Sequence, residues 1–360
     1  MEKKSKNPLK SILTIVISLA FAGFFLWFAL KGLDFKVIQK SLAKANYWWV
    51  LFAACFGASA YWFRAIRWNL MLEPMGHNIS NSNSLWSISF GYLMNLTIPR
   101  SGEVARATAL YGVEKVPVDQ SFGTIILERV VDLICMIAFL LLTLVFKFDA
   151  ILSFYDFVIK KKDEKEKFNP NFFEKQMMKL GVNDFDSFYF YVKIILGILI
   201  FIGLILLYKY KKEKLINFGK GIFQGLTSIF KLKQKGKFIL YTLGIWISYY
   251  FAAYLVCFAL PETSNFTFAD GFLIIVVGTL GMMVPASGGI GAFNLAMKYG
   301  FMALFISMGK SGVEGGEIGL TYSFISLPMQ IVIMLVMGLI SIPMLAKARN
   351  AAVEEKEITE

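Results

Sequence analysis

The chain has 360 residues, of which 57% are hydrophobic and only 17% are charged, and its mean hydropathy is +0.60. This composition excludes a soluble globular protein and predicts an integral membrane protein. The net charge of +12 would suggest nucleic acid in a soluble protein, but in a membrane protein it marks loops that face anionic lipid. We therefore expect no nucleic-acid partner. Three cysteines in apolar runs predict no disulfide framework, and one histidine cannot build a metal site alone, so we expect no metal and no cofactor.

Apolar segments of about 20 residues can cross the hydrocarbon layer as helices. Six such segments run approximately over residues 11–30, 47–72, 121–146, 187–208, 238–260 and 320–345. Two further apolar stretches, 85–110 and 266–308, are interrupted near Pro99 and Pro285 by proline and glycine. Each predicts two half-length helices around a turn, because proline removes a backbone donor and glycine loosens the backbone. The sequence thus predicts an all-α polytopic membrane protein with six full spans and two re-entrant or broken helical hairpins.

The distribution of lysine orients these segments in the membrane. Residues 209–237 contain nine lysines and one acid, so we place this loop in the cytoplasm. Residues 147–186 contain eight lysines and eight acids, so we place them outside as an insert. Six spans then put both termini in the cytoplasm of a multi-pass protein of the inner cell membrane. Residues 31–46 fall outside despite four lysines, and their spacing suits an amphipathic interfacial helix.

The two interrupted stretches correspond at an offset of 186 residues, which aligns Asn95–Ala105 with Gly281–Gly291. The same offset brings the spans of the two halves into register. We therefore divide a single transmembrane domain, 1–345, into repeat one (11–146), the insert and repeat two (187–345), followed by a charged cytoplasmic tail at 346–360. Three crossings per repeat invert the second half, as in transporters whose substrate binds where two broken helices meet. The alternative is that any two broken helices look alike.

Ionisable side chains inside a membrane are costly and usually face a cavity or a partner. They gather in the cytoplasmic half of repeat one, where intervals of three or four place each group on one helix face. The set comprises Arg64, Arg67, Arg100, Glu103, Arg106, Glu128, Arg129 and Asp132. Five arginines against three carboxylates predict a site in which ion pairs fix the geometry and surplus arginine binds phosphate. A half-helix beginning near Ser101 would add its N-terminal dipole.

Each group also has a structural explanation. Arg64 and Arg67 could snorkel to the headgroups beside Trp68, near the end of their span. The charges at 128–132 could dock one helix on another. The glycine-rich residues 288–291 lack the lysine and the preceding strand of a phosphate loop, which favours close helix packing or a hinge.

Four motifs in order resemble the lysylphosphatidylglycerol synthase transmembrane region, the flippase-like domain of multiple peptide resistance factors. They are Arg64-x-x-Arg67-Trp68, Asn95-x-x-x-Pro99-x-x-Gly102-Glu103-x-x-Arg106-Ala107, Glu128-Arg129-x-x-Asp132 and Pro285-x-x-Gly288-Gly289-Ile290-Gly291. The resemblance covers about residues 11–345 and implies movement of an aminoacylated phospholipid between leaflets, or a role in glycolipid or polyprenyl-phosphate pathways. The sequence departs from the family pattern in two respects that bear on function. The aminoacyl-transferase domain of the larger relatives is expected to be absent after Leu345, and Asn294 stands where the family commonly has glutamate.

The leading hypothesis is a lipid translocase that binds an anionic phosphate headgroup and has no catalytic residue. Its predicted substrate-binding residues are Arg64, Arg67, Asn95, Pro99, Arg100, Glu103, Arg106, Glu128, Arg129, Asp132, Pro285, Ser287, Gly288 and Asn294. One alternative is a membrane-embedded transferase that uses a lipid-phosphate donor, which is disfavoured because carboxylates beside arginines are poor general bases. Another is a membrane anchor that partners a separate lipid-modifying synthase through residues 209–237.

Overall fold

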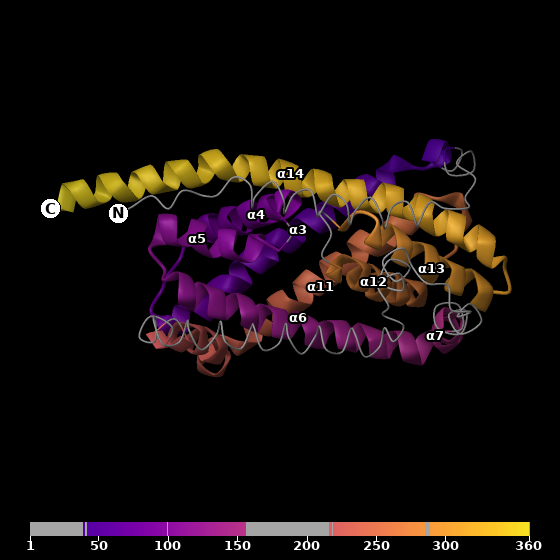
Figure 1. Ribbon diagram of the computed structural model, residues 1–360, viewed down its shortest axis with the longest axis horizontal. Helices are drawn as coiled ribbons and strands as arrows, with labels where there is room; N and C mark the ends of the chain where they lie inside the picture. The colour runs from indigo at the N-terminus through magenta and orange to yellow at the C-terminus, as the bar shows by residue number, and fades with distance from the viewer. Residues whose placement is uncertain are drawn as a thin grey trace, which may run out of the picture.

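The computed structural model of this chain describes residues 39, 42–98, 100–155, 216–217, 219–284 and 289–359. These residues form helices joined by turns, and no strand occurs among them (Figure 1). The protein is therefore an all-α polytopic membrane protein. The spans predicted at 11–30 and 187–208 lie outside the described residues, as does most of the insert at 147–186, of which Phe148–Tyr155 forms helix α7.

Four long apolar helices have the length and composition of membrane spans. They are α3 (Tyr47–Leu72), α6 (Val118–Phe146), α11 (Lys235–Cys257) and α14 (Gly312–Thr359). They confirm four of the predicted spans, and α3 has the predicted bounds. With 48 residues at about 1.5 Å per residue, α14 is more than twice as long as the hydrocarbon layer is thick. The tail predicted from residue 346 continues this helix.

Each interrupted stretch forms two short helices, as its proline and glycine residues predict. The first stretch forms α4 (Asn81–Thr97) and α5 (Gly102–Glu114), and the second forms α12 (Phe268–Met283) and α13 (Ala292–Ser307). Positive φ angles mark both breaks, 61° at Arg100 and 84° at Gly291, and residues in this region cannot continue a right-handed helix. The 3-10 helices η1 (Glu73–Met75), η3 (Ser228–Lys231) and η4 (Pro261–Thr263) lie in connecting segments.

The two halves pack on each other reciprocally. Helix α3 packs against α11, its counterpart in the second half, while α6 packs against α12 and α14 packs against α4. The broken pair α4–α5 lies toward one end of the long axis and the pair α12–α13 toward the other (Figure 1). The long helix that follows each broken pair thus packs against the first helix of the other broken pair.

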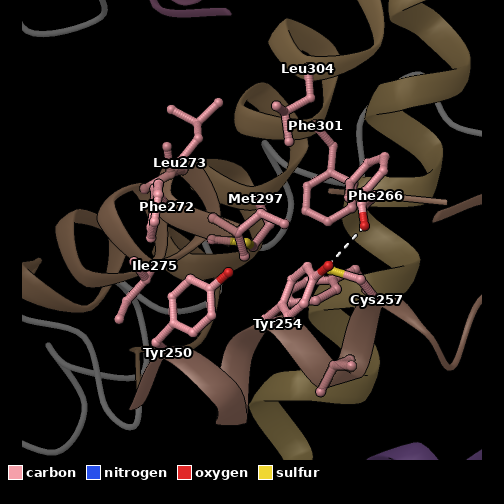
Figure 2. Packing of buried hydrophobic residues seen from close by; sticks show 14 of the residues in the cluster. Tyr250, Tyr254, Cys257, Phe266, Phe272, Leu273, Ile275, Met297, Phe301 and Leu304 are labelled. Carbon is pink, nitrogen blue, oxygen red and sulfur yellow. Dashed lines mark hydrogen bonds between the residues drawn. The ribbon is translucent and has the colours of Figure 1, made fainter. Parts of the chain in front are cut away.

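The second half is held together by an apolar and aromatic core. Figure 2 shows Tyr250 and Tyr254 of α11 facing Phe272, Met297 and Phe301, which come from α12 and α13. The Tyr254 hydroxyl donates to the Phe266 carbonyl at 2.9 Å, so its polar end is satisfied. The core of the first half also buries charged side chains.

Candidate functional site

Arg64 and Arg67 lie on the face of α3 that points into the bundle. Their side chains are only 3% and 0% exposed, although each carries a full positive charge. Burial of this kind is costly unless the charge is paired. The snorkelling explanation is therefore wrong, because both guanidinium groups are enclosed by protein.

Two carboxylates of α6 pair these arginines. Glu128 accepts from Arg64 and from Arg106, whose Nη2 lies 2.7 Å from Glu128 Oε2, and Arg67 Nη2 lies 3.7 Å from Glu128 Oε1. Asp132, one turn along α6, accepts from Arg64 at 3.2 Å and from Arg67 at 3.0 Å. We call these five residues the ion-pair network. Three arginines and two carboxylates leave it with a net charge of +1.

Arg106 also lies against an aromatic ring. Its guanidinium carbon is 3.8 Å from the ring centroid of Trp68, a cation–π contact from α5 to α3. The Trp68 indole N–H donates to the Thr124 hydroxyl at 2.8 Å, which fixes the plane of the ring. Trp68 and Thr124 therefore hold Arg106 in place, and neither was among the predicted site residues.

Helix α11 of the second half supplies two further contacts. Arg64 Nη2 donates to the Tyr249 hydroxyl at 3.0 Å, and Arg67 Nη1 donates to the Thr242 hydroxyl at 3.4 Å. Tyr249 and Thr242 are seven residues apart, so they share a face of α11. The sequence offered no signal for them beyond polar side chains in an apolar helix. Both halves of the chain thus build the ion-pair network.

Some hydrogen-bond donors of the ion-pair network have no partner in the described part of the chain. The Nε atoms of Arg64, Arg67 and Arg106 are buried and have no hydrogen-bond partner among the described residues. Buried donors are nearly always paired in proteins, because an unpaired one costs about 1–3 kcal/mol. The cluster therefore combines a surplus positive charge with three buried donors that have no partner among the described residues, and its ion pairs also join α6 to α3 and α5.

A small pocket lies beside the network at the first break. It is lined by Ile88, Gly91, Tyr92, Asn95, Gly102, Glu103, Arg106 and Arg129. At its edge Arg129 Nη2 lies 2.9 Å from Glu103 Oε1, and these side chains are 49% and 26% exposed. Arg106 belongs to both the pocket and the ion-pair network. The pocket therefore lies between the exposed pair and one arginine of the ion-pair network.

Close backbone contact shapes this pocket. A Cβ atom at Gly102 would overlap the Gly91 carbonyl and the Asn95 amide, so only glycine allows α4 and α5 to meet there. The Asn95 side chain accepts from the Gly102 N–H at 2.7 Å and satisfies one of the free donors at the start of α5.

Arg100 lies apart from the predicted cluster. The expectation that it shares a helix face with Glu103 and Arg106 is wrong, because α5 begins only at Gly102 and Arg100 has a φ of 61°. Its side chain instead crosses to the second half, where Nη2 donates to the Met283 carbonyl at 2.5 Å. Met283 is the last residue of α12, so this contact joins the two breaks.

The second break is held by a buried asparagine. Asn294 is 1% exposed, accepts from the Gly291 N–H at 3.0 Å and donates to the Ser323 hydroxyl at 2.7 Å. It thus caps α13 and ties it to α14, much as Asn95 caps α5. The other predicted residues of the breaks, Pro99, Pro285, Ser287 and Gly288, lie outside the described residues.

Comparison with known proteins agrees with the resemblance found in the motifs. Residues 15–160 match the model of the family described as Lysylphosphatidylglycerol synthase TM region. No curated protein and no solved structure matches the chain. The matched segment includes α3, α4, α5 and α6, and so contains every residue of the ion-pair network. Residues 15–160 are therefore similar to the lysylphosphatidylglycerol synthase TM region family.

Proposed function

We propose that this protein is a membrane lipid translocase that moves a lipid with an anionic phosphate headgroup between leaflets. The family match supports a lipid-related membrane protein. The observation that carries the proposal is the ion-pair network, where a net positive charge and three unpartnered Nε donors are buried beside a pocket at the first break. Arginine suits this role because its planar fork of donors matches phosphate.

In this proposal the phosphate first meets the exposed edge of the pocket. Arg129 is the more exposed partner of its pair with Glu103, so exchanging that carboxylate for a phosphate costs little. Arg106 lies next, and a phosphate that binds it competes with Glu128 for the same guanidinium. Binding would thus loosen the contact between α5 and α6, and Arg64 and Arg67 would retain Glu128.

The two breaks supply the parts that move. Short helices on both sides of a break can tilt without unfolding a full span, which is the usual device of transporters with paired broken helices. The Arg100–Met283 hydrogen bond joins the breaks in the arrangement described here. Its rupture would let α5 and α12 separate, while Asn95 and Asn294 keep the starts of α5 and α13 capped.

Transport of fluorescent lipids in reconstituted liposomes tests the proposal. Purified protein is compared with protein-free liposomes for anionic, aminoacylated and polyprenyl-phosphate lipids, with chemical reduction of the outer-leaflet fluorophore as readout. The Arg129→Gln variant should slow transport about tenfold, since it removes a charge-assisted contact to phosphate at a partly exposed and structurally tolerant position.

Arg349→Gln is the matched control, because this arginine is exposed near the end of α14 and far along the chain from the pocket. It should transport like the unmodified protein. Transport no faster than in protein-free liposomes for every lipid, or equal rates for Arg129→Gln and Arg349→Gln, would contradict the proposal.

A further inference from the structure

A second cationic feature lies outside the ion-pair network. Residues 219–237, here called the lysine segment, contain five lysines and no acid. They form a helix over residues 219–227, then η3, and they lead into the first turn of α11. All five lysines are exposed, namely Lys220, Lys231, Lys233, Lys235 and Lys237. The segment itself carries only positive charge, although Lys233 Nζ lies 3.9 Å from Glu73 Oε1.

The lysine segment is docked on α6 by its small residues. A Cβ atom at Gly225 would lie 2.6 Å from the backbone of Gly123, so the two helices touch backbone to backbone. Gln120 at the start of α6 donates to Gln224 at 3.3 Å, and Leu232 is buried. This contact fixes which face of the segment points away from the protein.

The outward face combines aromatic rings with lysine. Phe223, in the helix over residues 219–227, is 67% exposed, and Phe230, in η3, is 81% exposed. Two exposed phenylalanines are unfavourable in water, but they suit the boundary between headgroups and acyl chains. The segment packs on the first turns of α6 and leads directly into α11, and both helices have the length and composition of membrane spans.

We propose that the lysine segment is a docking surface for the anionic headgroup layer of the bilayer. Phe223 and Phe230 enter the boundary with the acyl chains, and the surrounding lysines bind lipid phosphates. The charge is complementary to an anionic leaflet, where each added lysine strengthens attraction and zwitterionic lipid offers little. This surface uses no residue of the ion-pair network or its pocket, so it stands whether or not the protein translocates lipid.

An environment-sensitive fluorophore on a single cysteine tests this surface in the full-length protein. Cys55, Cys135 and Cys257 are first replaced by alanine, and Phe223→Cys or Phe230→Cys is then labelled and reconstituted. With phosphatidylglycerol in the vesicles, we expect a blue-shifted emission, strong quenching by brominated acyl chains and weak quenching by aqueous iodide. In pure phosphatidylcholine vesicles the shift should be smaller. Replacing Lys220, Lys231, Lys235 and Lys237 by glutamine should raise the phosphatidylglycerol fraction needed for half of the response at least about twofold.

Asn265→Cys serves as the matched control, because Asn265 is exposed beyond the opposite end of α11 and lies outside the lysine segment. Its emission should not depend on the phosphatidylglycerol fraction. Labels at 223 and 230 that iodide quenches fully in both kinds of vesicle would overturn the proposal. An equal response in both kinds of vesicle would overturn it as well, because insertion would then owe nothing to anionic headgroups.

Discussion

Arg106 Nη2 lies 2.7 Å from Glu128 Oε2, and this ion pair joins the short helix that follows the first break to the long helix after it. Any tilt of α5 away from α6 must therefore separate two buried opposite charges. Because Glu128 also accepts from Arg64, the carboxylate keeps a partner when Arg106 moves. The position of α5 is thus coupled to the charge balance inside the membrane.

Among single substitutions in the first half, neutralising Glu128 should lower the stability of the protein most. Glu128→Gln leaves Arg64 and Arg67 with Asp132 and removes the carboxylate that pairs with Arg106, and loss of one partner in a buried ion pair costs about 3–5 kcal/mol. Thermal unfolding in detergent measures the effect. Glu103→Gln, at a partly exposed pair, should cost only about 0–1 kcal/mol. Equal losses for the two variants would show that Glu128 is not buried among the arginines.

Adding a side-chain atom at the close contact between α4 and α5 should disturb the pocket. Gly102→Ala places a Cβ atom against the Gly91 carbonyl and the Asn95 side chain, so the two helices must separate. We expect a lower melting temperature and slower lipid transport. Gly112→Ala on the same helix is the control, because no described atom lies within 4 Å of its added Cβ and alanine favours helix by about 1 kcal/mol. A harmless Gly102→Ala would contradict the close contact.

The indole ring of Trp68 should stabilise the fold through both its aromatic face and its N–H group. Trp68→Phe keeps an aromatic ring but loses the hydrogen bond to Thr124 and weakens the cation–π contact with Arg106, at a cost of about 1–2 kcal/mol. Thr124→Val keeps the ring contact but removes this hydrogen bond and the one that the Thr124 hydroxyl donates to the Ser121 carbonyl at 2.7 Å. A double-mutant cycle of unfolding free energies should therefore give a coupling between Trp68 and Thr124. If the two substitutions change the unfolding free energy additively, Trp68 and Thr124 are not coupled.

A separate ion pair should fasten the two halves at their opposite ends. Lys147 Nζ, just after α6, lies 2.7 Å from Asp270 Oδ1 in the first turn of α12, and the Asp270 side chain is fully buried. Lys147→Met should cost about 2 kcal/mol, because it leaves that carboxylate without its cation. Adding Asp270→Asn should recover part of the loss. If the double variant is less stable than Lys147→Met by the full effect of Asp270→Asn alone, the pair does not interact.

Much of the fold could be predicted because it depends on local properties of the chain. An apolar run of sufficient length must form a helix in lipid, since the backbone has no other way to satisfy its polar groups there. The bounds of α3 and the positions of both breaks follow from this rule together with proline and glycine. The continuation of α14 to Thr359 could not be read in the same way, because a charged helix outside the membrane has no such constraint.

The candidate site likewise has features that the sequence predicts and features that it does not. The spacing of Glu128 and Asp132 on one face of α6 is a property of helix geometry and is visible in the sequence. The contact of Arg64 with Tyr249 joins residues 185 positions apart, and the Arg100–Met283 bond depends on a backbone turn just before α5. Sequence alone determined which charges must find partners inside the membrane. Only the tertiary structure decided which partners they found, because that choice depends on how each helix is rotated and which neighbour it packs against.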